Sequence, residues 1–203
     1  MPRPKKTAAE LQATREQILD TALAILQESG PQAISSRAIA ERLGVAHMFL
    51  FTYFKNQACI LNALREREMA RWGARQAAIA QRAETGSVPQ VVRALLELFS
   101  TFARENPNLY RLAWVMPEAI GENPEDNRRR TRETVGNLSK LLALGMERGD
   151  FERRDPFLAA GTVLGMVNTP YILFHTGKMI DPVMRERMVA EMLSAAATYL
   201  QKK

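Results

Sequence analysis

The chain has 203 residues, of which 46% are hydrophobic and 25% charged, a composition that excludes a disordered or low-complexity protein. Its formal net charge of +6 at pH 7 suits an anionic partner such as DNA but does not identify one. We read no apolar run approaching the ~20 residues that span a bilayer, and the single Cys59 excludes an internal disulfide, so we expect a cytoplasmic protein.

The chain begins with a basic segment that no apolar stretch follows, so we expect no secretory signal there. We expect this segment to be an arm that can touch DNA phosphates or a minor groove through Arg3, Lys5 and Lys6. The spacing of Thr7 and Glu10 is that of a capping box. It predicts a first helix, which continues at helical spacing of apolar residues until Gly30.

The stretch from Ile34 to Leu61 predicts two short helices joined by a tight turn and followed by a third. Ser35 or Ser36 can cap a helix over 37–43, and Gly44 supplies the residue without a Cβ that a left-handed helix end favours. A second short helix is expected from about residue 46 to 52. This pattern is typical of a helix-turn-helix, whose second helix enters the major groove of DNA.

On these residues the chain resembles the tetracycline-repressor (TetR) family of bacterial transcriptional regulators. Residues 15–30 resemble the family's first helix, and 54–66 resemble the start of its fourth helix. The resemblance implies an all-α fold with an N-terminal three-helix helix-turn-helix module, which we place with the arm at residues 1–56. A long helix would join this module to a larger helical ligand-binding and dimerisation domain at residues 57–203.

The residues that we expect to contact DNA lie on the second short helix and at the starts of its neighbours: Ser35, Ser36, Arg37, Ala46, His47, Met48, Phe49, Phe51, Thr52, Tyr53, Lys55 and Gln57. His47 can donate or accept at a base edge, and Met48 and Phe49 can contact thymine methyl groups. The hydroxyl groups and Lys55 suit the phosphate backbone.

Two of these positions depart from the pattern of the family that the chain resembles. The recognition helix often ends in Tyr and the next helix often opens with Lys, where this chain has Phe51 and Gln57. Both changes remove a phosphate contact, the second a charge-assisted one. The rings of Phe49 and Phe51 can alternatively belong to the core of the module.

Beyond the module, the spacing of capping residues and prolines predicts further helices and no strand. Asn56 is expected to cap a fourth helix running to about Arg82, and we interpret most of its basic residues as a solvated face: Arg65, Arg67, Arg71, Arg75 and Arg82. Four Asn-Pro or Asp-Pro pairs then place a capping side chain before a proline, and the helices are expected near 88–105, 107–115, 124–148, 156–175 and 182–201. Pro117 and Pro170 are expected to end or kink helices.

The two last predicted helices carry small and Met-rich faces. Gly161 and Gly165 on helix 156–175 would let another helix approach closely. The resemblance implies that these two helices form a four-helix interface in a homodimer. The alternative is that they pack only within the subunit.

Several large and aromatic side chains lie on helices that should surround one interior: Phe99, Phe102, Tyr110, Trp114, Met116, Met166, Asn168, Tyr171 and His175. These residues can form an ordinary core. The resemblance implies instead a cavity among them that binds a small inducer. Because few acids lie there, an apolar or aromatic ligand is favoured over a polar cation.

We find no catalytic constellation, no metal-ligand spacing around His47 or His175, and no motif for a cofactor, so we expect no enzyme. The sequence therefore favours a regulator, a repressor that a small apolar or aromatic ligand releases from a palindromic operator. One alternative is a constitutive DNA-binding protein without ligand response. Another is an all-α interaction protein that has lost DNA binding.

Overall fold

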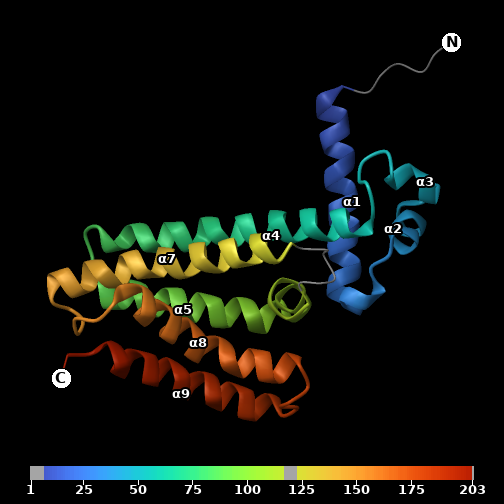
Figure 1. The fold of residues 1–203 in the computed structure, drawn as a ribbon. Coiled ribbons are helices and arrows are strands. Elements are labelled where there is room, and N and C mark those ends of the chain that lie inside the picture. The colour runs from blue at the N-terminus through green and yellow to red at the C-terminus, as the bar shows by residue number, and fades with distance from the viewer. Residues whose placement is uncertain (1–6, 117–122, 203) are drawn as a thin grey trace.

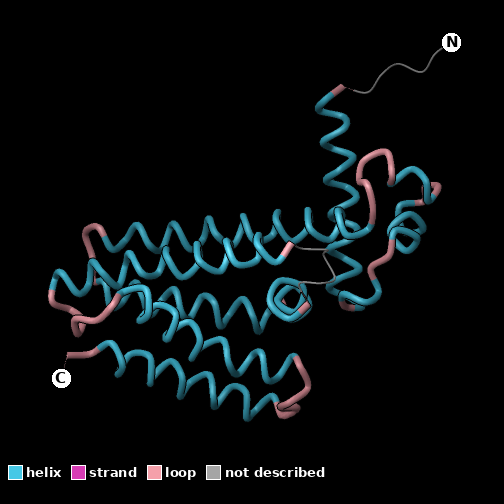
Figure 2. Tube along the Cα trace, in the orientation of Figure 1, coloured by secondary structure: helices cyan, strands magenta, loops and turns pink. Residues whose placement is uncertain are grey.

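The computed structural model describes residues 7–116 and 123–202, and the expected arm and Pro117 lie outside these residues. The described residues are helical and contain no strand, which confirms the all-α expectation (Figure 2). The elements are, in chain order, α1 (Ala8–Ser29), the 3-10 helix η1 (Pro31–Ala33), α2 (Ser36–Leu43), α3 (His47–Leu50), α4 (Gln57–Ala80), the 3-10 helix η2 (Gln81–Ala83), α5 (Val88–Glu105), α6 (Pro107–Tyr110), the π-helix η3 (Arg111–Val115), α7 (Pro124–Arg148), α8 (Pro156–His175) and α9 (Pro182–Leu200).

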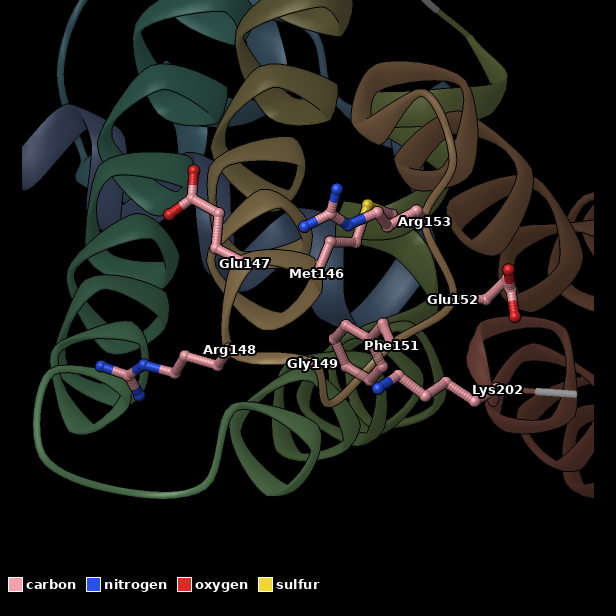
Figure 3. Close-up of a pocket in the computed structure, with 8 residues that line it drawn as sticks. All are labelled: Met146, Glu147, Arg148, Gly149, Phe151, Glu152, Arg153 and Lys202. Carbon is pink, nitrogen blue, oxygen red and sulfur yellow. The ribbon is translucent and has the colours of Figure 1, made fainter.

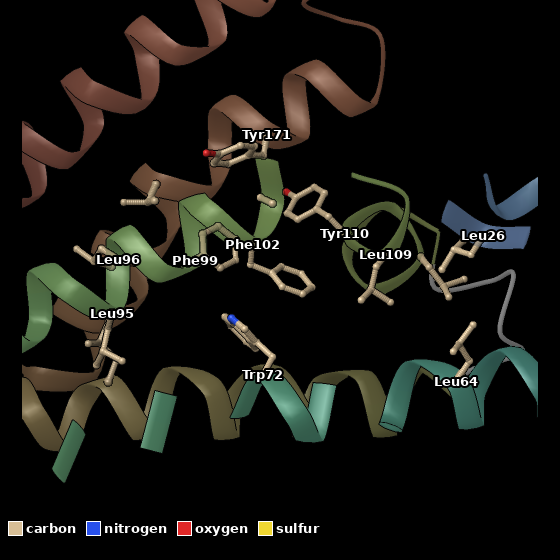
Figure 4. Packing of buried hydrophobic residues seen from close by; sticks show 14 of the residues in the cluster. Leu26, Leu64, Trp72, Leu95, Leu96, Phe99, Phe102, Leu109, Tyr110 and Tyr171 are labelled. Atoms are coloured by element: carbon tan, nitrogen blue, oxygen red, sulfur yellow. The ribbon is translucent and has the colours of Figure 1, made fainter. Parts of the chain in front are cut away.

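The helices form two parts that meet at α1 and α4. α1 stands across one end of α4 and carries α2 and α3 on its outer side, while α5 packs along α4 and α8 and α9 lie on the far side of α5 and α7 (Figure 1). α5 is the central helix of this bundle, since it packs against α4, α6, α7, α8 and α9. Its buried face includes Val88, Leu96 and Phe99 (Figure 4). The long α4 therefore connects the small N-terminal part to the bundle.

Most helix starts follow from the capping side chains. Thr7 and Glu10 form the predicted capping box at α1, and the side chain of Asn56 accepts a hydrogen bond of 2.9 Å from the amide of Cys59. The predicted caps of α7, α8 and α9 also accept amide hydrogen bonds. Asn106 is the exception, because its side-chain amide donates instead to the carbonyl of Phe102 at 3.3 Å.

Some predicted boundaries were wrong. The second short helix ends at Leu50 instead of about residue 52, because Leu50, Tyr53 and Phe54 all turn into the core and the chain tightens into a turn. α4 ends at Ala80, and the predicted helix over 107–115 divides into α6 and η3. Pro170 does not end a helix, since α8 continues five residues beyond it to His175.

α8 corrects our reading of the apolar runs. The helix has 20 residues, and its most apolar 18-residue stretch has a mean hydropathy of 1.5, so by length and composition it could cross a membrane. A core helix of a soluble protein passes the same test, but only 33% of its most apolar stretch is buried in this subunit. The helix thus leaves much of its apolar surface uncovered.

The basic residues of α4 are not all a solvated face. Arg65 is buried, with 3% of its surface exposed, and the side chain of Arg67 is 12% exposed. Arg67 donates to Glu16 at 3.0 Å and to Asp20 at 2.8 Å, both on α1, and pairs with Glu68 on its own helix. This network fixes the angle between α1 and α4.

Candidate functional site

The helix-turn-helix assembles as its sequence predicts. Gly44 ends α2 with a φ of +67°, a left-handed conformation that L-residues with a Cβ rarely adopt. The amide of Val45 then returns to the carbonyl of Ala40 at 3.0 Å, and this turn brings α3 against α2. Ile39 and Leu50 are completely buried between the helices. The free face of α3 is therefore presented on the outside of the molecule.

This free face combines one polar ring with large apolar side chains. Met48 is 71% exposed and Phe51 is 37% exposed. His47 is exposed as well, its Nε2 lies 2.8 Å from Ser36 Oγ, and its ring meets Phe51 edge-on at 5.1 Å. The hydroxyl and the imidazole thus hold each other in place, and the ring remains exposed to a partner such as a base edge.

Two aromatic residues of the predicted set lie mostly inside. Tyr53 is only 8% exposed, so its ring belongs to the core and is poorly placed for a phosphate contact. Phe49 is half-buried, packs on the core and lies 5.1 Å from Tyr53. The alternative that these rings belong to the core of the module therefore fits Phe49 better than Phe51. Ala46 and Thr52 flank α3 and are both exposed.

The residues expected at phosphates fall into two groups. Arg37 and Lys55 are exposed and form no ion pair within the described part of the chain. The side chains of Ser35 and Gln57 instead form hydrogen bonds within the protein. The hydroxyl of Ser35 caps α2 by accepting from Ala38 at 3.0 Å, and the Gln57 amide donates to the carbonyl of Ile34 at 2.9 Å.

The sequence reasoning missed the contacts that hold α3 in position. Arg15 of α1 donates to the carbonyl of Tyr53, and its guanidinium lies 4.2 Å above the ring of Phe54. Arg42 and Glu28 form a two-armed pair at 2.6 Å that ties α2 to α1. No local sequence signal pairs these residues, because each contact joins positions far apart in the chain.

The aromatic residues of the bundle do come together, in what we call the aromatic cluster. Tyr110 stacks on Trp114 at 5.3 Å and lies 4.9 Å from His175, and Phe99 meets Trp114 and Tyr171 at 5.7 and 6.2 Å. The sequence analysis missed one member, Trp72, which extends from α4 toward the rings of α5 (Figure 4). The members are Trp72, Phe99, Phe102, Tyr110, Trp114, Tyr171 and His175.

Burial sets the protonation of this cluster. The hydroxyl of Tyr110 donates to Asn168 Oδ1 at 2.6 Å and that of Tyr171 donates to the carbonyl of Ser100 at 2.9 Å. Burial raises the pKa of both tyrosines. Burial also lowers the pKa of His175 to about 4, and the charges of Arg185 and Arg111 add to that shift. The cluster is therefore electrically neutral at pH 7.

The predicted cavity stays a prediction, and the rings of the cluster lie in contact with one another. Two hollows formed by the described residues lie elsewhere. One hollow of about 350 Å³ lies at the end of the bundle away from α1, between α7 and the C-terminal end (Figure 3). The other, of about 320 Å³, lies between α7 and Phe157.

Two residues of the predicted ligand set, Met116 and Met166, are not members of the aromatic cluster. Met116 lies against the N-terminal part, where its sulfur is 3.9 Å from Gln32 Nε2. Met166 is half-buried and packs against the core. Close to Met116, the side chain of Asn108 donates to the carbonyl of Gln27 at 3.3 Å, so α6 touches the end of α1. The cluster and the DNA-facing part are thus joined through α6.

Comparison with known proteins places the strongest similarity in the N-terminal part. The model of a family described as "Bacterial regulatory proteins, tetR family" matches residues 18–64. The chain is 42% identical over 52 residues to the class C tetracycline repressor protein of Escherichia coli, covering 26% of this chain and 24% of that protein. It is 32% identical over 111 residues to the nucleoid occlusion factor SlmA of Actinobacillus pleuropneumoniae, covering 54% and 52%. The chain thus matches about a quarter to a half of the length of these relatives.

Solved structures resemble the chain over nearly its whole length. A regulator of the TetR/AcrR family from Thermobifida fusca is 25% identical with a TM-score of 0.70, covering 94% of this chain and 100% of that one. A protein described as a transcriptional regulator from Saccharomonospora viridis, in complex with choline, is 18% identical with a TM-score of 0.77, covering 95% and 100%. The fold of the bundle is therefore shared even where the sequence has diverged.

Proposed function

Because the chain belongs to the TetR family of bacterial regulatory proteins, we propose that it is a dimeric repressor released from a palindromic operator by a small ligand. The observation that carries the proposal is the outer face of α3. His47 and Met48 are exposed on a helix-turn-helix whose helices are held together by the buried Ile39 and Leu50. A preassembled reading surface needs little reorganisation to enter a major groove.

Within this proposal, some residues contact bases and others contact phosphates. His47 reads a base edge, and Met48 supplies apolar contact to a thymine methyl group. Arg37 and Lys55, exposed on either side of α3, bind phosphates and carry the salt dependence. Ser35 and Gln57 have lesser roles, since each already satisfies a backbone group of the module.

The uncovered face of α8 and α9 supports a homodimer. Large apolar side chains are exposed at Phe157 (45%), Leu158 (68%), Ile180 (85%), Val183 (65%) and Met184 (46%). Exposed apolar area of this kind marks an interaction surface. A Cβ built at Gly161 or Gly165 would meet no atom within 4 Å, so a second helix has room to approach there. A two-fold dimer would bury this face and place two copies of α3 on one side of the duplex.

The aromatic cluster is the proposed effector site. Its apolar rings and few polar groups are typical of small-molecule sites, and α6 links it to the end of α1. Since the rings are in contact here, a ligand has to part them, and α6 and η3 are the elements that carry Tyr110 and Trp114. Displacing α6 would move its contacts with α1. This route gives a ligand differential affinity for two states of the DNA-binding part.

A second candidate function has an observation of its own. One curated relative with which the chain aligns over more than half its length is a nucleoid occlusion factor, and the rings of the cluster lie in contact with one another. Both favour a DNA-binding protein without ligand response. An interaction protein that no longer binds DNA is a weaker alternative, which rests on Phe51 and Gln57.

A mobility-shift assay on the DNA upstream of the chain's own gene, against a shuffled duplex, separates these functions. Preferred binding to the upstream DNA, weakened by salt, supports a DNA-binding regulator. Equal or absent binding contradicts it. A small-molecule screen for release of the bound DNA then distinguishes the ligand-controlled repressor from the constitutive protein.

A further inference from the structure

Three buried polar groups at the aromatic cluster lack a partner among the described residues: Trp72 Nε1, Ser100 Oγ and His175 Nε2. Trp72 is 8% exposed and Ser100 is 5% exposed, yet Trp72 Nε1 and Ser100 Oγ form no hydrogen bond with any described residue. The indole reaches from α4 into the group of rings formed by Phe99 and Phe102 (Figure 4). An unsatisfied buried donor costs about 1–3 kcal/mol, and native structures rarely keep one without a reason. An indole N–H can only donate, so its missing partner is an acceptor.

The edge of the cluster carries an unbalanced positive charge. Arg111 opens η3, is half-buried, and its buried Nε has no hydrogen-bond partner within the described residues. Its charge and that of Arg185 both act on His175. Arg185, however, is neutralised by Glu186 at 2.6 Å, whereas Arg111 has no ion pair in the described part of the chain. The charge of Arg111 therefore acts at the edge of the cluster, and the described residues supply no ion pair for it.

The two features lie on connected elements. Arg111 and Trp114 belong to the same π-helical turn, and Trp114 meets Trp72 edge-on at 5.8 Å. π-helical turns are rare and are frequently found at functional sites. Nη1 of Arg111 also lies 3.8 Å from the position that a Cβ of Gly30 would take, so this guanidinium stands between the cluster and the end of α1.

We propose that the effector is an organic carboxylate with an aromatic or aliphatic body, whose charge pairs with Arg111 and whose oxygen accepts from Trp72. This proposal rests on the proposed function, since it takes the aromatic cluster as the effector site. The body of the ligand would replace ring–ring contacts, and the carboxylate would supply both the missing acceptor and the missing counter-ion. Carboxylate–guanidinium pairs are among the stronger hydrogen-bonded contacts in proteins.

The same charges argue against a quaternary ammonium ligand. Aromatic faces attract such cations, and the similar structure from Saccharomonospora viridis contains choline. In this chain Arg111 would repel a cation from the cluster, and the only carboxylate whose charge is felt at Tyr171, that of Glu186, is already held by Arg185. Aromatic composition alone therefore does not decide whether the ligand is a cation or an anion.

Calorimetry with three matched pairs of probes tests the proposal: benzoate, 2-naphthoate and decanoate, each against its primary amide, with choline as the cation. We expect at least one carboxylate to bind about tenfold or more tightly than its amide, because charged hydrogen bonds exceed neutral ones by about that amount. Choline should not bind. Arg111→Gln should abolish the preference for the acid over the amide. Arg93→Gln, which removes an exposed charge of α5, should leave it unchanged.

A second variant separates the two contacts. Trp72→Phe keeps an aromatic ring and removes the donor, so it should weaken the acid and the amide alike by several-fold, since both offer an acceptor oxygen. The proposal is overturned if no carboxylate binds, if amides or choline bind as tightly, or if Arg111→Gln leaves the preference intact. DNA binding by the ligand-free variants is measured in parallel. If DNA binding and its release by some other class of molecule persist, the proposed function stands while the carboxylate is rejected.

Discussion

The N-terminal part and the bundle differ in how completely their buried polar groups are satisfied. Across residues 7–56 the structure leaves no buried side-chain nitrogen or oxygen without a hydrogen bond, and Arg15, Ser36 and Gln57 each hold a neighbouring element. In the bundle, Trp72 Nε1 and Ser100 Oγ are buried without a partner. The buried polar groups of the N-terminal part are thus satisfied without a bound molecule. The bundle has the properties of a site that a ligand completes.

The same contrast explains what a sequence can and cannot reveal. Thr7, Gly44 and Asn56 act on neighbours within a few residues, so caps and turns predicted the helices and the helix-turn-helix closely. The aromatic cluster was predicted in outline, because aromatic residues on several helices tend to share one interior. Trp72 and Arg111 were missed because their importance depends on what they fail to contact, and a sequence does not show that.

Other errors have physical reasons of the same kind. Pro170 lies inside α8 although an isolated proline is expected to break a helix, since surrounding contacts outweigh a local preference. Charge alone did not show which basic residues of α4 leave the solvated face, and the crossing of α1 over α4 places acids beside Arg67. Tertiary packing decides such cases.

The largest effect should come from a variant that separates the two subunits of the proposed dimer, and with them the two copies of α3. Gly165→Arg places a bulky charge on the uncovered face of α8, at a position where an added Cβ meets no atom within 4 Å. We expect monomers in light scattering and a loss of about 10²–10⁴ in DNA affinity, the gain that linking two sites supplies. Gly73→Arg on α4, where a Cβ also meets nothing within 4 Å, is the matched control and should remain dimeric. A monomeric unmodified protein would refute the dimer.

The next largest effect concerns base reading. His47→Ala should cost ~1–3 kcal/mol on the preferred operator and much less on random duplex, because a base contact is sequence-dependent. Fluorescence anisotropy with both duplexes measures the difference. The fold should be unaffected, since His47 is exposed. Equal weakening on both duplexes would move the base-reading role to Thr52.

A smaller, sequence-independent effect should follow from the phosphate contacts. Lys55→Ala should weaken all duplexes alike and reduce the slope of log K against log salt by about 0.9, the value for one released counter-ion. Gln57→Lys should act in the opposite direction if the start of α4 faces a phosphate. An unchanged slope for Lys55→Ala would remove that residue from the interface.

The smallest effect tests the bundle through its histidine. The pKa of His175 in the folded protein is about 4, below its ordinary value of 6.5, so between these values the unfolded chain binds more protons. The free energy of unfolding should therefore be fully retained above pH 6.5 and fall as the pH drops toward 4. Denaturant titrations of the unmodified protein and His175→Gln should show a shallower fall in the variant. Parallel curves would mean that His175 is not buried as neutral imidazole.

The most direct test of the account is selection of bound sequences from a random-sequence duplex library. A dimer with two fixed reading surfaces predicts a near-palindrome, with half-sites in successive major grooves about 34–36 Å apart. His47→Ala should relax the preference at one position in each half-site symmetrically. Enrichment of a single unrepeated site, or of no sequence at all, would contradict the central claim that this chain reads DNA as a two-fold dimer.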